Sequence, residues 1–254
     1  MKVCFDTFGC RLNRAEALAQ EAGLMSRGWT TTKYHAEADL IVIRGCSVTA
    51  RAQRDCEHLV EHVRMKYPTK RIVVTGCMRE KAGEQIFRDL DLTKVPSSTS
   101  RAYLKVQDGC SCSCAFCIVP QFRGRGESVP FNTVIERAKQ MADFGYHEIV
   151  LSGCNLTQYS SDSKRLPELV EKLAAIDRRC RIRLGSVEPG HIADALVDIM
   201  ADNVNICRSF HLPFQSGSQT VLSAMRRPYS LKDAEEIAHK AVKLMPHISI
   251  GCDL

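Results

Sequence analysis

Three cysteines that could hold a reactive metal centre lie in one short stretch of the chain. Cys110, Cys114 and Cys117 are spaced CxxxCxxC within the sequence VQDGCSCSCAFCI at residues 106–118. Three thiolates this close in sequence can converge on one soft metal centre and leave a coordination position open for a substrate or cofactor. A structural zinc site would need four ligands, and no second cysteine pair follows nearby. We interpret Cys112 as a bystander, because its spacing suits no common cluster loop.

Three further cysteines each follow a glycine at the end of a β-rich run: Cys10, Cys46 and Cys77. Ligands of open parallel sheets bind beyond the carboxyl ends of the strands. We therefore expect these thiols to converge at one sheet edge, where glycine lets the backbone approach closely. Three cysteines in register predict a second metal site. Cys4 and Cys56 lack the preceding glycine, and we interpret them as core or surface thiols.

The elements that position these cysteines repeat along the chain. Residues 1–95 show a strand, a Gly-Cys turn and a helix three times, which predicts an N-terminal parallel three-layer α/β domain. Asn13 is expected to cap the first helix. The apolar face of that helix would consist of Leu18, Ala19, Ala22 and Met25. The predicted strands cover residues 2–8, 40–43 and 71–75, and the helices run to about residue 28, from 49 to 65 and to about residue 90.

The second half of the chain continues the alternation. Residues 96–101, with one proline and three serines, are predicted to be a linker. Residues 102–254 are predicted to be a partial β/α barrel that is incomplete (truncated) at its C-terminal end. Its predicted strands cover residues 103–106, 148–151, 181–184 and 207–212, with a last one at 248. Its predicted helices cover residues 132–144, 166–176, 191–200 and 219–225, with a further one ending at 244. Active sites of such barrels lie at the C-terminal ends of the strands, so we expect the functional residues in the loops that follow them.

Composition narrows the class of protein only a little. Residues of hydrophobic type make up 44% of the chain, and 35 Lys and Arg against 29 Asp and Glu give a net charge of +6, which is compatible with a nucleic-acid partner. The 13 cysteines do not form the dense, even pattern of a small secreted scaffold. No leader-like apolar segment starts the chain, and no run approaches the length of a membrane span. We therefore expect a cytoplasmic protein without a membrane partner.

The cysteine motifs resemble a known family. The CxxxCxxC spacing after an apolar run is similar to the radical S-adenosylmethionine (SAM) signature, and the flanking sequences AYLKVQDGC and FCIVPQFRGRGES resemble methylthiotransferases that modify tRNA. FGCRLN, GCSVTARAQR and VTGCMRE resemble the N-terminal domain of the same family. The resemblance implies two 4Fe-4S clusters, a catalytic one on Cys110, Cys114 and Cys117 and an auxiliary one on Cys10, Cys46 and Cys77. One departure is Arg44-Gly45, where the family usually has Asn-Thr; another is the short linker.

The loops after the later strands would then hold S-adenosyl-L-methionine. Gly153 allows close approach, Asn155 offers a paired donor and acceptor, and the Glu188 carboxylate can bind the ammonium group or ribose hydroxyls of the cofactor. The complete set of candidate cofactor-binding residues is Gly153, Asn155, Ser186, Glu188, Gln215, Ser216, Gly217 and Arg226. Arg123, Arg125 and Arg227 are further candidates for a phosphate or carboxylate, because guanidinium pairs bidentately with both. His211 is interpreted as an inward-facing strand residue.

The resemblance implies an enzyme that adds a methylthio group to carbon 2 of threonylcarbamoyl-adenosine in the tRNA anticodon stem-loop, by radical SAM chemistry. An electron donor such as a flavodoxin or ferredoxin would be a partner. Isopentenyl-adenosine of tRNA, or an aspartate of a ribosomal protein, is the alternative substrate. A further hypothesis is a non-catalytic iron-sulfur protein or a degenerate fragment, because the family normally continues through the rest of the barrel and a small RNA-binding domain.

Overall fold

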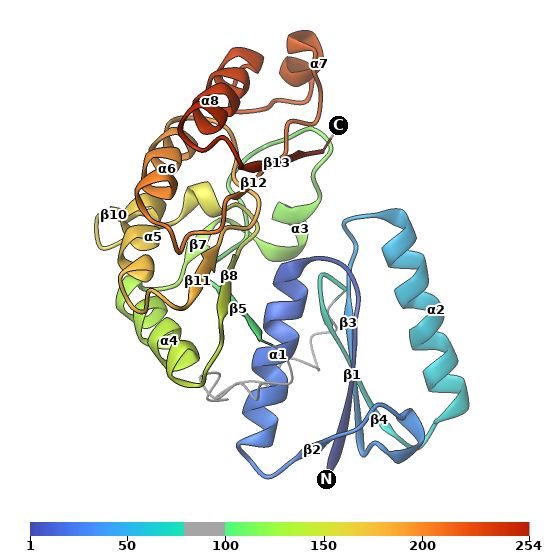
Figure 1. Ribbon diagram of the computed structural model, residues 1–254. Coiled ribbons are helices and arrows are strands. Elements are labelled where there is room, and N and C mark those ends of the chain that lie inside the picture. Colours follow the sequence, from blue (N-terminus) through green and yellow to red (C-terminus); the bar gives the residue numbers. More distant parts are fainter. Residues whose placement is uncertain (79–99, 254) are drawn as a thin grey trace. The chain divides into compact units, whose positions relative to one another are not determined.

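The computed structural model describes residues 1–78 and 100–253, which fall into two compact units, Met1–Pro96 (unit 1) and Ser97–Leu254 (unit 2). Figure 1 shows both units, coloured along the sequence. The helix predicted after Cys77 and residues 96–99 of the predicted linker lie outside the described residues. Each unit is described by itself below.

Unit 1 is built around one parallel sheet with the strand order β2-β1-β3-β4. Its strands are β1 (Lys2–Thr7), β2 (Thr30–Thr31), β3 (Leu40–Gly45) and β4 (Arg71–Gly76). Its helices are α1 (Arg11–Met25), the short 3-10 helix η1 (His35–Glu37) and α2 (Ala50–Lys66). Parallel strands joined by helices confirm the predicted class of fold.

The sheet of unit 1 carries an apolar layer on each face, because successive side chains of a strand point to opposite faces. Val3 packs with Leu24 of α1 on one face, while Cys4 packs with Val60 and Val63 of α2 on the other. The two helices therefore cover opposite faces of the sheet (Figure 1). This arrangement is the predicted three-layer domain.

Two predictions about α1 were wrong. The helix begins at Arg11 with Cys10 at its N-cap position, so Asn13 lies inside its first turn instead of capping it. The fully buried Asn13 donates hydrogen bonds to the Phe8 and Gly45 carbonyls, both at 2.9 Å. Its amide thus holds two strand ends together instead of serving the helix terminus. Met25, expected on the buried face, is exposed in the last turn.

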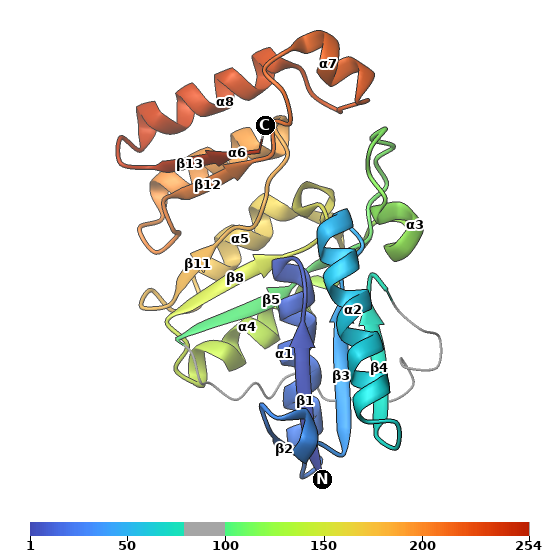
Figure 2. The ribbon, with the colours of Figure 1, turned by 90° about the vertical axis from the view of Figure 1, so that its right-hand side faces the viewer.

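Unit 2 has an arc of parallel strands. They are β5 (Arg101–Lys105), β8 (Glu148–Ser152), β11 (Arg181–Arg183), β12 (Ser209–Leu212) and β13 (Ser249–Cys252). β11, β8 and β5 form one sheet and β12 and β13 a second, and parallel bridges from Ile182 to Ile206 and from Ser186 to His211 connect them. Figure 2 shows these strands following one another across the unit.

Helices alternate with these strands, as in a β/α barrel. They are α3 (Val119–Arg123), α4 (Phe131–Asp143), η3 (Leu156–Gln158), α5 (Leu166–Ala174), α6 (His191–Asp202), α7 (Gln219–Ala224) and α8 (Leu231–Leu244). The short antiparallel pairs are β6 (Gln107–Asp108) with β7 (Glu127–Ser128) and β9 (Ser160–Ser161) with β10 (Lys164–Arg165). In the described part of the chain, none of the helices combines the length and apolar character that crossing a membrane requires.

Candidate functional site

The cysteine loop of unit 2 lies between β6 and α3, beyond the carboxyl end of β5. Cys110 is buried, and Cys114 and Cys117 are half-buried. The Cys117 amide donates to the Cys114 carbonyl at 3.1 Å, which folds the end of the loop into a turn. Burial raises the pKa of the Cys117 thiol, and the neighbouring Cys114 and Cys110 raise it further. The structure thus brings the three predicted thiols within electrostatic reach of one another.

Asp108 anchors the start of this loop. Its carboxylate accepts hydrogen bonds from Lys105 Nζ at 2.5 Å, Arg123 Nη1 at 2.9 Å and the Gly109 amide at 2.8 Å. Burial opposes ionisation of the carboxyl group, but the two cations outweigh it and hold the pKa of Asp108 at about 2. Arg123, a candidate for cofactor contact from the sequence, therefore supports the loop through Asp108.

The loop after β8, which carries the predicted cofactor residues Gly153 and Asn155, lies against the start of the cysteine loop. A Cβ on Gly153 would lie 2.9 Å from the Gln107 side-chain oxygen, so glycine permits this close approach. The same Gln107 oxygen accepts from the Asn155 amide at 2.9 Å. The Asn155 side-chain oxygen accepts from Thr157, which turns its NH₂ group toward Cys112 Sγ at 3.8 Å and Cys110 Sγ at 4.0 Å. Asn155 is therefore oriented as a donor to the cysteine loop.

Cys112 is held by a second glutamine. Gln158 Nε2 donates to Cys112 Sγ at 3.0 Å, and the oxygen of the same side chain accepts from the Ser111 amide at 2.9 Å. Burial, together with Cys110, raises the pKa of the Cys112 thiol to about 12. Sequence reasoning missed Gln107 and Gln158, because a polar side chain next to a strand carries no signal until the fold shows which loop it supports.

An ion pair closes the other side of the cysteine loop. Arg227 pairs with Glu188, donates from Nη1 to Cys114 Sγ at 3.3 Å and from Nε to Tyr229 Oη at 3.2 Å. Burial raises the pKa of Glu188, and the positive charge of Arg227 counteracts part of this shift. The side chain of Arg227 is only 5% exposed. Arg226, the residue that the sequence favoured, is instead exposed and has a positive φ of 56°.

The other predicted cofactor residues lie on loops after β11 and β12. Ser186 Oγ lies 2.8 Å from His211 Nδ1 across the bridge between these strands. Gln215 adopts a φ of 69°, and its amide donates to the carbonyl of Asp253 at 2.7 Å. Ser216 and Gly217 follow in the same turn, where Ser216 Oγ accepts from the amide two residues on. These residues occupy the edge of the strand arc on which cofactors of β/α barrels bind.

The three Gly-Cys turns of unit 1 meet at the carboxyl edge of its sheet. The glycines that end β3 and β4 are paired in register, and the Cys77 amide donates to the Gly45 carbonyl at 3.1 Å. Burial raises the pKa of the Cys46 thiol, and Cys77 and Cys10 raise it further. A Cβ on Gly9, which has a φ of 88°, would lie 2.6 Å from Cys46 Cβ. The fold thus gathers three thiols that are far apart in sequence.

Arg44, which departs from the family pattern, lies at the end of β3. Its side chain is buried, pairs with Glu16 of α1 and donates to Gln20 Oε1 at 2.7 Å. A buried cation is tolerated only when it is paired in this way. Helix α1 thus supplies the carboxylate of Glu16 and the amide of Gln20 that accommodate Arg44 in the buried position.

Comparisons with known proteins agree with both units. Residues 104–253 match the Radical SAM superfamily, and residues 2–95 match the family described as "Uncharacterized protein family UPF0004". The solved structure of the radical SAM methyltransferase TsrM from Kitasatospora setae covers 99% of this chain with a TM-score of 0.64 at 12% identity, a likeness of fold alone. The fold and the cysteine loop therefore define a radical SAM protein.

Curated relatives narrow the family. A threonylcarbamoyladenosine tRNA methylthiotransferase of Chlamydia pneumoniae is 33% identical over 97% of this chain and 65% of its own length. A tRNA-2-methylthio-N(6)-dimethylallyladenosine synthase of Chlorobium phaeobacteroides is 30% identical over 100% of this chain and 67% of its own length. The chain belongs to the radical SAM methylthiotransferase family. It spans about two thirds of the length of the curated relatives that it matches.

Proposed function

We propose that this protein transfers a methylthio group to carbon 2 of threonylcarbamoyl-adenosine next to the anticodon of tRNA. The observation that carries the proposal is the presence of two separate sets of three thiols, one in each unit, each placed beyond the carboxyl ends of parallel strands. The relatives named for this substrate, from Chlamydia pneumoniae and Aquifex aeolicus, support the choice. The dimethylallyl-adenosine named for other relatives is the second candidate substrate.

The residues of unit 2 fit an iron-sulfur cluster with SAM. Within the described ranges, the only three potential ligands whose donor atoms all lie within 4.8 Å of one another are Cys4, Asp6 and His35. The three thiols of the cysteine loop therefore do not all lie within 4.8 Å of one another, yet Cys110 and Cys114 act electrostatically on Cys117, which is compatible with a cluster larger than a single ion. When bound, the cluster and SAM would supply the radical chemistry at carbon 2. We assign the cluster to Cys110, Cys114 and Cys117.

Other residues of unit 2 would position these groups. Arg227 would donate to Cys114 and balance part of the thiolate charge, and Asn155 would donate toward Cys110. Hydrogen bonds to cluster sulfurs and nearby charge set the reduction potential of such a site. Glu188, held by Arg227, would supply the carboxylate for the ammonium group or ribose of SAM, with Ser186 on the same loop and Gln215 on the loop after β12.

Unit 1 would hold the auxiliary cluster on Cys10, Cys46 and Cys77. Two of these thiols are buried and the third lies at the start of α1. Three ligands leave one iron open, and this position would present the sulfur that is transferred. The reaction would require a low-potential electron donor such as a flavodoxin or ferredoxin. The protein would act on tRNA in the cytoplasm.

The test is mass spectrometry of tRNA nucleosides from cells that lack their own methylthiotransferase, with and without this chain. We expect a methylthio-threonylcarbamoyl-adenosine peak that disappears in Cys110→Ala and in Cys46→Ala and persists in Cys56→Ala. The last variant removes a buried thiol outside both cluster sets. A methylthio-isopentenyl-adenosine peak would favour the second substrate. Purified protein with far fewer than about eight irons per chain would contradict the two-cluster assignment.

A further inference from the structure

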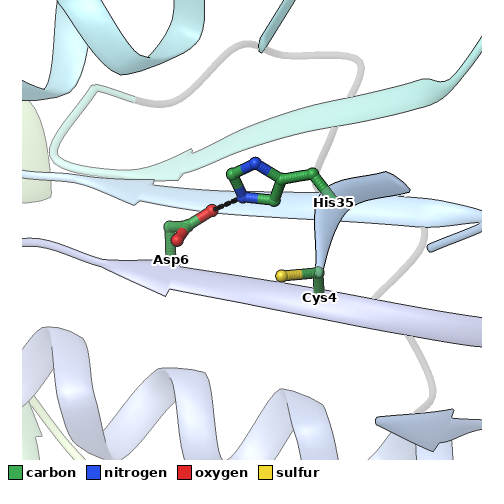
Figure 3. A group of neighbouring side chains, drawn as sticks. All are labelled: Cys4, Asp6 and His35. Carbon is green, nitrogen blue, oxygen red and sulfur yellow. Dashed lines mark hydrogen bonds and ion pairs between the residues drawn. The ribbon is translucent and has the colours of Figure 1, made fainter. Parts of the chain in front are cut away.

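Unit 1 contains a third group of metal-ligating side chains, away from its Gly-Cys turns. Cys4 Sγ, an Asp6 carboxylate oxygen and a His35 ring nitrogen all lie within 4.8 Å of one another. Figure 3 shows the three side chains converging, with His35 Nε2 at 2.7 Å from Asp6 Oδ2. Neither the proposed chemistry nor the cluster assignment uses these residues.

The backbone explains why the three residues meet. Cys4 and Asp6 are two positions apart in β1, so their side chains point to the same face of the sheet. Both stand opposite residues of β3, in register with Ile41 and Ile43. His35 opens η1, the short helix between β2 and β3.

The surroundings hold the imidazole in place. The His35 ring packs edge-on against Tyr67, with the ring centroids 6.1 Å apart. Side-chain exposures of 19% for His35 and 29% for Asp6 leave a path for an ion, while Cys4 is buried at 3%. The site is thus closed on the core side and open on the other, as expected for an ion bound at the edge of a packed layer.

We propose that Cys4, Asp6 and His35 bind a divalent transition-metal ion, Zn²⁺ fitting best, at a site separate from both clusters. Thiolate, imidazole and carboxylate are the three ligand types of protein zinc sites. Ligand atoms around a tetrahedral Zn²⁺ are separated by about 3.5 Å, given metal-ligand distances of about 2.0 to 2.3 Å. Small side-chain rotations would open the His35–Asp6 pair and draw Cys4 Sγ closer.

The chemistry of the three donors favours zinc over harder cations. Ca²⁺ and Mg²⁺ require oxygen ligands, whereas only one of the three donors here is an oxygen. Three protein ligands leave the fourth position of the ion for water. The bound ion would tie η1 to β1 and so fasten the crossover between β2 and β3. The alternative is that no metal binds and that the hydrogen bond between His35 and Asp6 alone ties η1 to β1.

The experiment uses the full chain with both clusters reconstituted, so that iron occupies the cluster thiols. Co²⁺ serves as the spectroscopic probe, because a thiolate ligand gives a charge-transfer band and tetrahedral geometry gives visible ligand-field bands. We expect one Co²⁺ per chain, displaced by one equivalent of Zn²⁺, with iron unchanged. The charge-transfer band should disappear in Cys4→Ala. In His35→Gln and Asp6→Asn the affinity should fall at least about 100-fold, beyond the effect of a supporting residue.

Cys56→Ala is the matched control, because Cys56 is a buried thiol that packs in the same core as Cys4. It should keep the cobalt spectrum. If Cys4→Ala does not fold, His35→Gln tests the proposal instead, because His35 belongs to a short helix at the surface and its replacement disturbs the core less. The proposal is overturned if the reconstituted protein binds no Co²⁺ with a thiolate band, if the band survives in Cys4→Ala, or if His35→Gln binds Co²⁺ with unchanged affinity. Neither outcome would affect the tRNA assay, so the two proposals fail separately.

Discussion

The two sets of three cysteines that we propose as cluster ligands are assembled in different ways. In unit 2 the thiols belong to one loop, and side chains from other loops surround it, among them Asn155, Gln158 and Arg227. In unit 1 each thiol comes from a different strand end, and the close packing of Gly9 against Cys46 is part of the assembly. In unit 2, a local sequence motif thus brings the three proposed ligands together, and the fold determines which side chains surround them. The other set exists only when the sheet has formed.

Removing single cysteines should separate the two sets most strongly. Cys114→Ala is expected to abolish SAM cleavage and to lower the iron content from about eight to about four per chain. Cys46→Ala should lower iron by the same amount but keep SAM cleavage, because the catalytic set lies in another unit. Iron analysis and chromatographic measurement of 5′-deoxyadenosine check both results. Loss of cleavage in Cys46→Ala would mean that the two sets are not independent.

The second prediction concerns backbone packing in unit 1. Gly9→Ala places a Cβ against Cys46 and forces alanine into a positive φ, so it should destabilise unit 1 by about 3 kcal/mol and lose the auxiliary iron. Gly28→Ala is the matched control, because its φ of 84° is similar but nothing lies within 4 Å of the added atom. It should cost only about 1 kcal/mol.

Urea unfolding of the apo-protein measures this difference. The single tryptophan, Trp29, packs against the core of unit 1, so its fluorescence reports on that unit. Equal destabilisation by the two variants would show that the contact with Cys46 does not contribute to the loss of unfolding free energy and that backbone strain alone causes it.

Arg227 tests how strongly the fold tunes the catalytic set. Arg227→Lys keeps the charge but cannot bridge Glu188, Tyr229 and Cys114 together, because lysine lacks the planar fork. We expect SAM cleavage to slow by about 10- to 100-fold with iron retained, which corresponds to about 1.4 to 2.7 kcal/mol. Arg226→Lys is the control and should behave as wild type. Similar rates for both variants would remove Arg227 from the site.

The smallest effect concerns Asp108 and is pH-dependent. Its pKa of about 2 lies below the ordinary value of 3.8, so its ion pairs stabilise unit 2 above about pH 4, and this contribution is lost as the pH falls toward 2. Asp108→Asn should therefore lower the stability of the apo-protein by about 1 kcal/mol at pH 7, with partial exposure screening the pairs, and by less near pH 3. Unfolding monitored by circular dichroism at the two pH values tests this. A difference that does not change with pH would contradict the ion-pair account.

Much of the architecture could be predicted because the strand and helix patterns are local. The alternation of apolar runs and helices gave both parallel α/β units, and the Gly-Cys turns indicated that three distant cysteines end neighbouring strands. The prediction that Asn13 caps α1 was wrong for a tertiary reason. Helix patterns show which residues can form a helix, but the side chain of Asn13 is committed to carbonyls that only the folded sheet presents.

The sequence by itself determined the candidate ligands of unit 2, because the CxxxCxxC spacing keeps the three cysteines within eight residues of one another. Only the tertiary structure decided what surrounds them. Arg226 and Arg227 are adjacent and chemically identical, yet Arg226 is exposed and Arg227 lies against Cys114, because Arg226 itself has a left-handed backbone that turns the chain before Arg227. The Cys4, Asp6 and His35 group was likewise invisible in the sequence. Its third member is 29 residues away from the second, and only the crossover between β2 and β3 carries it back to the strand.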